Sequence, residues 1–392
     1  MLATQAPEPL EQVTQATAPQ VGLVSGNRMV ALAALAAGCR FFSGYPITPS
    51  SEIYQTMMEE LPGLGGVALA APDEISALAY CVGASLAGHK AMTATSGPGW
   101  CLMIETVQYA VMTETPVVIA LVQRLGPSTG GATQGAQGDV LLAEFCTSGG
   151  YTIPVFAPSD ARECFELTQV AFRWAERLRT PVVLLSDKEV GMTMESVDSA
   201  ALPRAEPARR RLVAGGQRFL TQACHCLEEP PDFAPVGGQA RVVATGSAHD
   251  REGRLRKNAP EVVELLIHLQ AKMVAHQEDM ALVRLARDDF ADTLVISYGI
   301  TARAAREACR RLRARGRRVS FLQPLTLFPV ATEALGQAAA GCSRVVIAEE
   351  NLTGQYATVL DPYLAGRRVV RVNRVAEMIP PAEIMAAVEE GP

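Results

Sequence analysis

Short apolar runs separated by turn-forming residues recur through the first half of the chain and predict alternating strands and helices. The run at residues 116–122 is almost wholly apolar, as expected for a parallel strand that is buried on both faces. We therefore predict a doubly wound α/β domain. Its strands are expected at 41–45, 67–70, 91–95, 116–122 and 181–186, and its helices at 22–41, 74–88, 102–113, 160–178 and after Ser50 or Ser51.

The alternation of predicted strands and helices is lost between about residues 193 and 238, where proline and glycine pairs are typical of a linker. We interpret Arg209–Arg211 in this stretch as solvated. A smaller α/β unit follows. Its strands are expected at 293–297, 319–322, 344–348 and 368–372, with a helix from Thr301 through Arg313, a loop at 324–329, and a helix at 261–286 that packs across both units. The predicted division is a disordered leader over 1–21, a first domain over 22–200, a linker over 201–238 and a second domain over 239–380.

Composition and charge narrow the classes of partner. The 392 residues are 48% hydrophobic but only 5% aromatic, which fits an Ala/Val/Leu-rich α/β protein with an ample core. A net charge of −6 gives no overall electrostatic reason to bind nucleic acid or an anionic membrane, and no apolar run is long enough for a membrane span. We expect a cytoplasmic protein.

The nine cysteines have no spacing typical of a disulfide scaffold, so reduced thiols are expected. Cys224-His225-Cys226 is the one tight cluster of metal-ligand types. No second ligand pair follows it, and three residues do not close a tetrahedral site, so we expect no metal there.

Two charged residues and a glycine-rich turn stand where predicted strands end, the edge at which open α/β sheets bind ligands. Glu74 opens a predicted helix and is either a carboxylate that complements the helix dipole or a buried acid that exchanges a proton. Arg124 suits a carboxylate ligand or forms a structural ion pair with Glu105 or Asp139. The stretch 95–99 is either a ligand-approaching turn or a plain tight turn.

Together these segments resemble the α subunit of 2-oxoacid:ferredoxin oxidoreductases over about residues 22–375. The first-half motifs are Tyr45-Pro46-Ile47-Thr48-Pro49-Ser50-Ser51, Asp73-Glu74, Thr93 to Gly99, Arg124, Gly126 to Gly130 and Gln137-Gly138-Asp139. The second-half motifs are Ser297 to Arg303, Pro324 to Pro329 and Glu349 to Gln355. The resemblance implies a pyrimidine-type thiamine diphosphate-binding domain followed by a smaller transketolase-C-like domain.

The resemblance also implies residue roles. Glu74 would bond the aminopyrimidine of thiamine diphosphate and act as the catalytic, activating acid, although it could instead serve the helix dipole. Thr48 and Arg124 would bind the 2-oxoacid carboxylate, with helix capping as the alternative for Thr48. The remaining cofactor-binding residues implied are Tyr45, Pro46, Ile47, Ser96, Gly97 and Pro98.

The implied partners follow from what the chain lacks. It has neither the GDG-plus-Asn pattern that anchors diphosphate through a metal nor a cysteine series for iron-sulfur clusters. A β subunit would supply Mg²⁺, the diphosphate site and a [4Fe-4S] cluster. Coenzyme A is the expected cosubstrate and ferredoxin or a flavoprotein the acceptor. A separate γ subunit is possible, and a dimer of heterodimers is expected.

The favoured substrate is 2-oxoglutarate, from the resemblance of Gly126–Gly130 and Thr245–Asp250 to that subgroup. The loop continues Gly131-Ala132-Thr133-Gln134-Gly135, where many subgroup members have Gly-Leu-Pro-Thr, and residues 125–145 hold no second basic residue for a distal carboxylate. Pyruvate, branched-chain and aryl 2-oxoacids therefore stay open. Other hypotheses are a transketolase-like or acetolactate-type thiamine enzyme, which the short chain disfavours, and a non-catalytic scaffold subunit.

Overall fold

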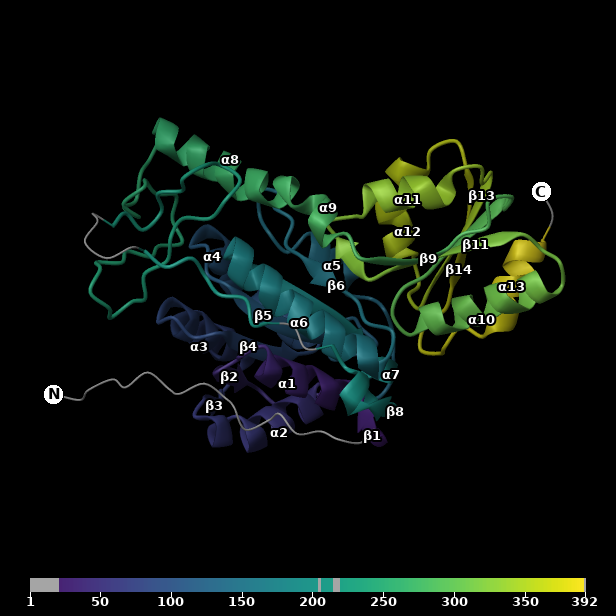
Figure 1. Ribbon diagram of the computed structural model, residues 1–392, viewed down its shortest axis with the longest axis horizontal. Helices are drawn as coiled ribbons and strands as arrows, with labels where there is room; N and C mark the ends of the chain where they lie inside the picture. The colour runs from purple at the N-terminus through teal and green to yellow at the C-terminus, as the bar shows by residue number, and fades with distance from the viewer. Residues whose placement is uncertain (1–20, 204–205, 214–218, 391–392) are drawn as a thin grey trace.

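The computed structural model describes residues 21–203, 206–213 and 219–390 and contains two α/β units built on separate sheets (Figure 1). The larger sheet has seven strands in the order β12-β6-β7-β5-β4-β2-β3, and the smaller has five in the order β14-β13-β10-β11-β9. The strands of the larger sheet are β2 (Phe41–Gly44), β3 (Val67–Ala70), β4 (Ala91–Thr95), β5 (Val117–Gln123), β6 (Val155–Phe156), β7 (Pro181–Asp187) and β12 (Thr326–Phe328). The strands of the smaller sheet are β9 (Val283–Ala286), β10 (Thr293–Ile296), β11 (Val319–Pro324), β13 (Arg344–Glu349) and β14 (Arg368–Asn373).

Helices cover both faces of the larger sheet, so the prediction of a doubly wound α/β fold is confirmed. Alternate residues of β5 belong to two different cores: Val117, Ile119 and Leu121 to one, Val118 and Ala120 to the other. The first core includes α3 (Glu74–Leu86) and α4 (Gly97–Met112), and the second includes α1 (Gly26–Ala36), α2 (Ser51–Glu60) and α6 (Ala161–Leu178). This two-sided burial explains why the strand reads as a continuous apolar run.

The chain start differs from the single helix expected at 22–41. Residues Val21–Ser25 form β1, which pairs antiparallel with β8 (Met194–Asp198), and α1 begins only at Gly26. The side chain of Ser25 accepts a hydrogen bond from the Arg28 amide and so caps α1. Of the predicted leader, residues 1–20 lie outside the described part of the chain.

Strand β12 joins the second half of the chain to the first sheet, where sequence analysis wrongly placed a loop. Thr326–Phe328 pairs antiparallel with β6. The buried Thr326 hydroxyl donates to the Met280 carbonyl and accepts from the Leu282 amide at 3.0 Å, which fixes the approach of the preceding segment. The strand is only three residues long and lies between two prolines, so its pattern resembled a turn.

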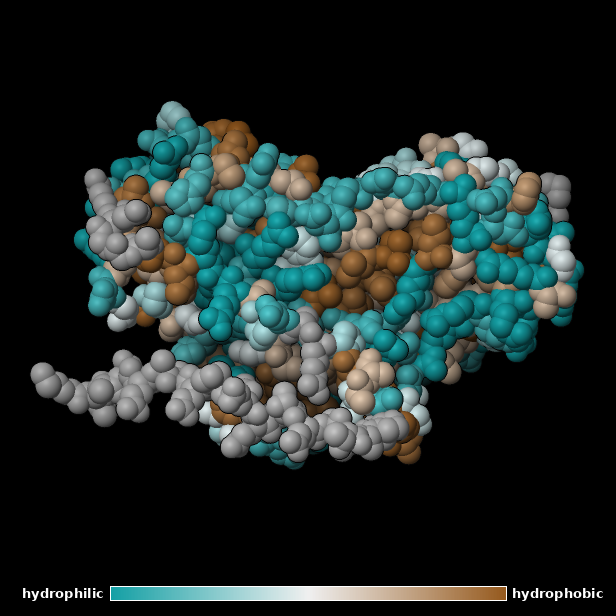
Figure 2. All heavy atoms as spheres, in the orientation of Figure 1, coloured by the Kyte–Doolittle hydropathy of each residue, from teal (hydrophilic) through white to brown (hydrophobic). Residues whose placement is uncertain are grey.

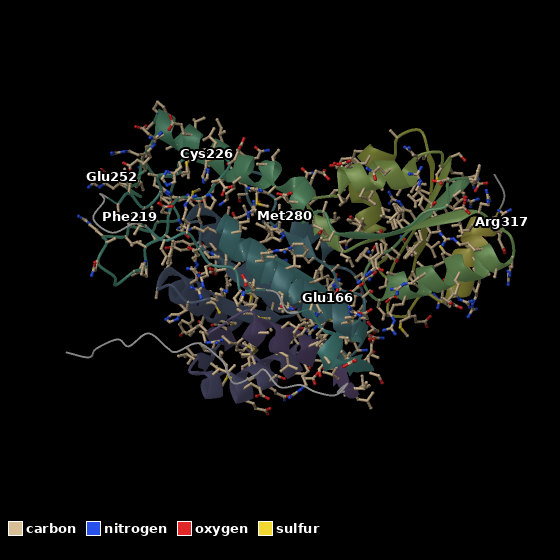
Figure 3. All side chains as sticks on the ribbon, in the orientation of Figure 1. Glu166, Phe219, Cys226, Glu252, Met280 and Arg317 are labelled. Atoms are coloured by element: carbon tan, nitrogen blue, oxygen red, sulfur yellow. The ribbon has the colours of Figure 1, made fainter. Side chains whose placement is uncertain are left out.

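The segment 261–286 is also not one helix. It comprises α8 (Pro260–Ala275), α9 (Gln277–Met280) and the edge strand β9. The expected packing across both units is confirmed, because Lys272 donates to Glu114 beside the first sheet at 2.7 Å while Gln277 donates to the Val330 carbonyl at 3.0 Å. Met280 is fully buried at this junction (Figure 3).

The remaining helices complete the two units. They are α5 (Val140–Glu144), α7 (Lys188–Met192), α10 (Thr301–Ala314), α11 (Thr332–Ala339), α12 (Gln355–Leu360) and α13 (Pro381–Glu389), with 3₁₀ turns at Pro62–Leu64, Ser199–Ala201 and Asp361–Leu364. In space-filling view, hydrophobic side chains gather in the hollow between the two lobes (Figure 2). Within the described residues, no helix is both long and apolar enough to cross a membrane.

The arginine triplet is not simply solvated. Arg210 is buried and pairs with both carboxylate oxygens of Glu176 on α6, at 2.8 and 3.0 Å, and its guanidinium also donates to the Ser85 and His89 carbonyls at the end of α3. A buried carboxylate needs such a partner, and here the partner comes from the irregular segment. That segment has no helix or strand from 202 to 259 among its described residues, and the domain limits at 200 and 239 stay our prediction.

Candidate active site

Four adjacent parallel strands of the larger sheet end at one edge and carry the predicted site residues there. Strand β2 pairs in parallel with β3 and β4, and β4 pairs in parallel with β5. Thr48 follows β2, Glu74 follows β3, Ser96 follows β4 and Arg124 follows β5. Carboxyl ends of neighbouring strands form the usual ligand crevice of an open α/β sheet.

Arg124 and Thr48 are in direct contact. The guanidinium donates one hydrogen bond to the Thr48 carbonyl at 2.6 Å and another to the Thr129 carbonyl at 3.0 Å, while its Nε is buried without a partner. Across the described ranges, no carboxylate pairs with this cation, so the alternative of an ion pair with Glu105 or Asp139 is not observed. The buried positive charge is therefore available for an anionic ligand.

Thr48 does not cap the helix that follows it, because Ser50 occupies the N-cap position of α2. Tyr45, Pro46 and Ile47 form the segment between β2 and Thr48. Tyr45 and Pro46 are exposed on the surface of this chain, and Ile47 is half-buried. The segment thus lies at the crevice edge with two side chains open to whatever binds there.

Glu74 is a buried carboxylate beneath the first turn of α4. It is the first residue of α3, whose N-cap is Asp73, and it is 6% exposed. A β-carbon on Gly99 would lie only 2.7 Å from Glu74 Oε1 and 2.2 Å from Thr95 Oγ1, so only glycine fits there. Glycine at position 99 therefore allows α4 to approach the Glu74 carboxylate closely.

Helix α4 begins at Gly97, five residues earlier than predicted, so Gly97-Pro98-Gly99 is its first turn rather than a loop. Pro98 suits the opening turn because its missing N–H would have no helical partner. The N-cap residue Ser96 is fully buried, and its hydroxyl has no hydrogen-bond partner. An unpaired buried hydroxyl at a helix start is suited to meet a polar group of a ligand.

A crevice of about 430 Å³ opens beside this helix start and is lined by both halves of the chain. Its lining includes Arg124 and Asp139 but not Glu74, which lies behind α4. The lining residues are Gly97, Pro98, Cys101, Arg124 to Ser128, Ala136, Gly138, Asp139, Leu142, Asn351 to Thr353, Gln355 and Val375.

Burial without compensating bonds raises the pKa of Asp139 to about 6, although Arg124 opposes the shift. Burial likewise raises the pKa of Glu350, next to the crevice-lining Asn351, to about 7, against the hydrogen bonds from the Ile379 amide and the Thr301 hydroxyl. Both residues belong to the sequence motifs, in which Asp139 is considered only as an ion-pair partner of Arg124 and Glu350 has no predicted role. Isolated burial of an acid cannot be read from a sequence pattern, so this signal was missed.

A fully buried glutamine ties the crevice wall to the second half. The Gln137 side chain donates to Asp187 Oδ2 at 2.9 Å and to the Tyr298 carbonyl at 3.2 Å, and its oxygen accepts from the Glu350 amide at 2.8 Å. Its backbone amide donates to the Glu350 carbonyl at 2.7 Å. The second-half motifs therefore hold a wall of the crevice in place.

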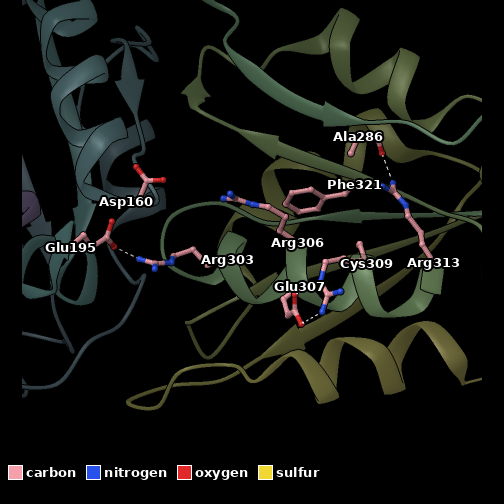
Figure 4. A pocket seen from close by; sticks show the side chains of 10 residues that line it. Asp160, Glu195, Ala286, Arg303, Arg306, Glu307, Cys309, Arg313 and Phe321 are labelled. Atoms are coloured by element: carbon pink, nitrogen blue, oxygen red, sulfur yellow. Dashed lines mark hydrogen bonds and ion pairs between the residues drawn. The ribbon is translucent and has the colours of Figure 1, made fainter. Parts of the chain in front are cut away.

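A larger cleft of about 570 Å³ lies elsewhere, between α10 and first-half residues (Figure 4). Arg303 and Arg313 line it, reaching the Glu195 carboxylate and the Ala286 carbonyl respectively. None of the predicted site residues lies on its wall. Sheet geometry therefore favours the smaller crevice as the catalytic one.

The residues that follow the parallel strands at this sheet edge fit an aminopyrimidine ring. Glu74 offers a buried carboxylate, Ser96 and Arg124 offer unpaired polar atoms, and glycines at 97 and 99 keep the approach open. Within the described residues, no three His, Cys, Asp or Glu side chains lie close enough together to hold a metal ion. Cys226 is exposed in the irregular segment (Figure 3).

Comparison with known proteins agrees with this geometry. Residues 32–268 match the thiamine diphosphate-binding domain of pyruvate flavodoxin/ferredoxin oxidoreductases, and residues 291–379 match core domain II of pyruvate:ferredoxin oxidoreductase. The 2-oxoglutarate synthase subunit KorA of Methanothermobacter marburgensis is 37% identical over 364 residues, covering 92% of this chain and 93% of that protein.

Two solved structures share the fold. A 2-oxoglutarate:ferredoxin oxidoreductase from Magnetococcus marinus, with 2-oxoglutarate, coenzyme A and succinyl-CoA bound, aligns with a TM-score of 0.87 at 30% identity and covers 95% of this chain. This chain spans 65% of the length of that one. A split-gene transketolase, an inactive β4 tetramer, aligns with a TM-score of 0.55 at 17% identity over 94% of this chain and 98% of its own, a likeness of fold alone. The chain thus belongs to the pyruvate flavodoxin/ferredoxin oxidoreductase family and is an α-type subunit of the 2-oxoacid:ferredoxin oxidoreductases.

Proposed function

We propose that this chain is the α subunit of a thiamine diphosphate-dependent enzyme that oxidatively decarboxylates 2-oxoglutarate to succinyl-CoA and passes electrons to a low-potential acceptor. The observation that carries the proposal is that buried Glu74 and the contacting pair Thr48 and Arg124 follow neighbouring parallel strands at one sheet edge. A buried carboxylate and a cation without a carboxylate partner at one sheet edge match a reaction that binds a 2-oxoacid and releases CO₂.

Glu74 is the activating acid in this proposal. When bound, thiamine diphosphate supplies the carbanion chemistry that decarboxylates a 2-oxoacid. The buried Glu74 carboxyl would hold a proton at the aminopyrimidine N1′, and α4 would keep bulk water away from it. Tyr45, Pro46, Ile47, Ser96, Gly97 and Pro98 would line the ring's binding site at the strand ends.

Thr48 and Arg124 orient the acid substrate. The guanidinium is fixed by two carbonyl acceptors and has no carboxylate partner among the described residues, so a substrate carboxylate would complete its coordination. Such charge-assisted bonds position the scissile carbon against the cofactor. When CO₂ leaves, the carboxylate that Arg124 holds disappears, which releases this contact.

The partner completes the site. A β subunit would bind the diphosphate through Mg²⁺ and carry a [4Fe-4S] cluster that receives electrons, and ferredoxin or a flavoprotein would accept them. A dimer of heterodimers, with or without a separate γ subunit, is the proposed assembly. All nine cysteines are free thiols, which supports a reducing, cytoplasmic setting.

Substrate preference for 2-oxoglutarate is supported by the KorA relative and by the solved complex with that acid bound. The test is anaerobic, coenzyme A-dependent viologen reduction by the chain co-expressed with its β partner. The acids compared are 2-oxoglutarate, pyruvate, 2-oxoisovalerate and phenylglyoxylate. We expect the highest kcat/KM with 2-oxoglutarate. A higher kcat/KM with another acid would identify that acid as the substrate instead. No activity with any acid, despite bound thiamine diphosphate and intact clusters, would contradict the catalytic assignment and favour a scaffold.

A further inference from the structure

Asp139 is a partly buried carboxylate that lines the crevice. Its Oδ2 atom is inaccessible to solvent and has no hydrogen-bond partner, yet the residue lines the crevice. Leaving a buried acceptor unpaired costs roughly the desolvation energy of that group, so such an atom in a binding crevice indicates a ligand that completes it.

The backbone around Asp139 is unusually well fixed. Its own amide donates to Gln123 Oε1 at 3.0 Å, and the Gly138 carbonyl accepts from Gln355 at 2.9 Å. The Gln137 carbonyl accepts from Asn351 at 3.0 Å. Side chains of β5 and of the second half therefore hold the segment on both sides, and the carboxylate position is set before any ligand binds.

The carboxylate also lies against the start of α4. A β-carbon on Gly97 would be 3.0 Å from Asp139 Oδ1 and 3.1 Å from Oδ2, closer than an ordinary contact. Glycine at this position leaves room for the acid beside the helix start that already carries the unpaired Ser96 hydroxyl. Arg124 lies across the same crevice but not within ion-pair distance of it.

We propose that Asp139 is an additional binding residue of the crevice, accepting a hydrogen bond from an uncharged donor group on the bound cofactor or cosubstrate. This inference rests on the proposed function. A 2-oxoacid in its ionised form has no hydrogen-bond donor to offer, whereas thiamine diphosphate carries the amino group of its pyrimidine and coenzyme A carries a thiol, amide N–H groups and hydroxyls.

The test compares Asp139→Asn and Asp139→Ala with wild type in the assembled complex. Thiamine diphosphate affinity is measured by calorimetric titration of the cofactor-stripped complex without substrate, and coenzyme A dependence by the KM in viologen reduction. Losing a hydrogen bond to a charged group weakens binding by about tenfold or more. Either the dissociation constant of thiamine diphosphate or the KM for coenzyme A should therefore rise by about that factor in Asp139→Ala, and by less in Asp139→Asn.

Glu144→Gln is the matched control, since Glu144 on α5 is also a partly buried acid with one buried, unpaired oxygen but does not line the crevice. This variant should leave both the dissociation constant of thiamine diphosphate and the KM for coenzyme A unchanged. A selective rise in the dissociation constant of thiamine diphosphate assigns the donor to that cofactor, and a selective rise in the KM for coenzyme A assigns it to coenzyme A. Unchanged constants in both Asp139 variants would overturn the inference, and far-ultraviolet circular dichroism verifies that they fold.

Failure of the proposed function would look different. The wild-type complex would then show no 2-oxoacid-dependent reduction at all, whereas the calorimetric titration needs no turnover and would still report on Asp139.

Discussion

At the scale of single residues, two arginines show opposite uses of a buried guanidinium. Arg210 is matched by Glu176 and three further acceptors, so its charge is fully used within the fold. Arg124 is held only by two carbonyls and keeps an unpaired Nε. A buried guanidinium that is paired with a carboxylate indicates a structural role, and one without a carboxylate partner at a sheet edge indicates a ligand-binding role.

Arg124→Lys should impair substrate binding although it preserves the charge. A lysine cannot reach the Thr48 and Thr129 carbonyls and a substrate carboxylate together, because it lacks the planar fork. We expect the KM for the 2-oxoacid to rise by about tenfold or more. Steady-state viologen reduction measures this, and the KM for coenzyme A should stay constant. An unchanged KM for the acid would show that Arg124 does not contact it.

Arg210→Met should destabilise the fold. It leaves the buried Glu176 carboxylate unpaired, which costs about 3–5 kcal/mol for a buried pair. Urea denaturation monitored by circular dichroism gives the free energy of unfolding. The double variant with Glu176→Met should recover much of the loss, because no lone charge remains buried. Equal stability of Arg210→Met and wild type would mean that the pair is exposed in solution.

At the scale of elements, the site depends on where helices start. Helices α3 and α4 both begin at the carboxyl edge of the sheet, and Gly99 lets them come close enough for Glu74 to lie beneath α4. The segment from β5 to α5 forms the facing wall and is held by Glu350 and Asn351, which follow β13, and by Gln355 of α12. These helices and strands thus fix the relative positions of Glu74, Arg124 and the segment from β5 to α5.

Gln137→Met should loosen this wall without unfolding the protein. Methionine keeps similar volume but removes the bonds to Asp187, Tyr298 and Glu350. Hydrogen exchange followed by mass spectrometry should show faster exchange over residues 126–139, with β3 unaffected. If exchange in 126–139 matches wild type, the wall is held by its backbone bonds alone.

Glu144→Gln should change how stability depends on pH. Burial raises the pKa of Glu144 to about 7, against the bond from Thr152, so the folded state binds its proton more tightly than the unfolded state. The stabilisation from Glu144 is complete below its ordinary pKa of 4.5 and is lost as pH rises through about 7. The variant lacks this titration. Relative to wild type, its unfolding free energy should therefore increase between pH 5 and pH 8, and a flat or falling difference would contradict the assignment.

At the scale of the whole molecule, the two halves behave as one structure. A single hydrophobic cluster includes Ile119 of β5 and Leu185 of β7 together with Ile296 of β10 and Ile347 of β13. Strand β12 extends the first sheet from the second half. Because the crevice wall also depends on both halves, separating them would be expected to dismantle the site.

Most of this architecture could be predicted from the sequence, because apolar runs and turn residues identify an element from neighbouring positions alone. Apolar runs located β5 and β7, and the turn residues after each parallel strand located Thr48, Glu74 and Arg124, which the common edge then brought together. Longer-range features were out of reach. The pairing of Arg210 with Glu176, the strand character of Thr326–Phe328 and the unpaired Asp139 oxygen all depend on tertiary neighbours that no sequence window contains.

The most direct test of the central claim is the 2-oxoacid-dependent viologen activity of Glu74→Gln in the assembled αβ complex. Glutamine fills the same space beneath α4 but cannot exchange a proton, so kcat should fall by at least about 100-fold. Circular dichroism and bound iron should remain at wild-type levels. Unchanged turnover in a folded, cofactor-loaded complex would contradict the assignment of Glu74 as the activating acid.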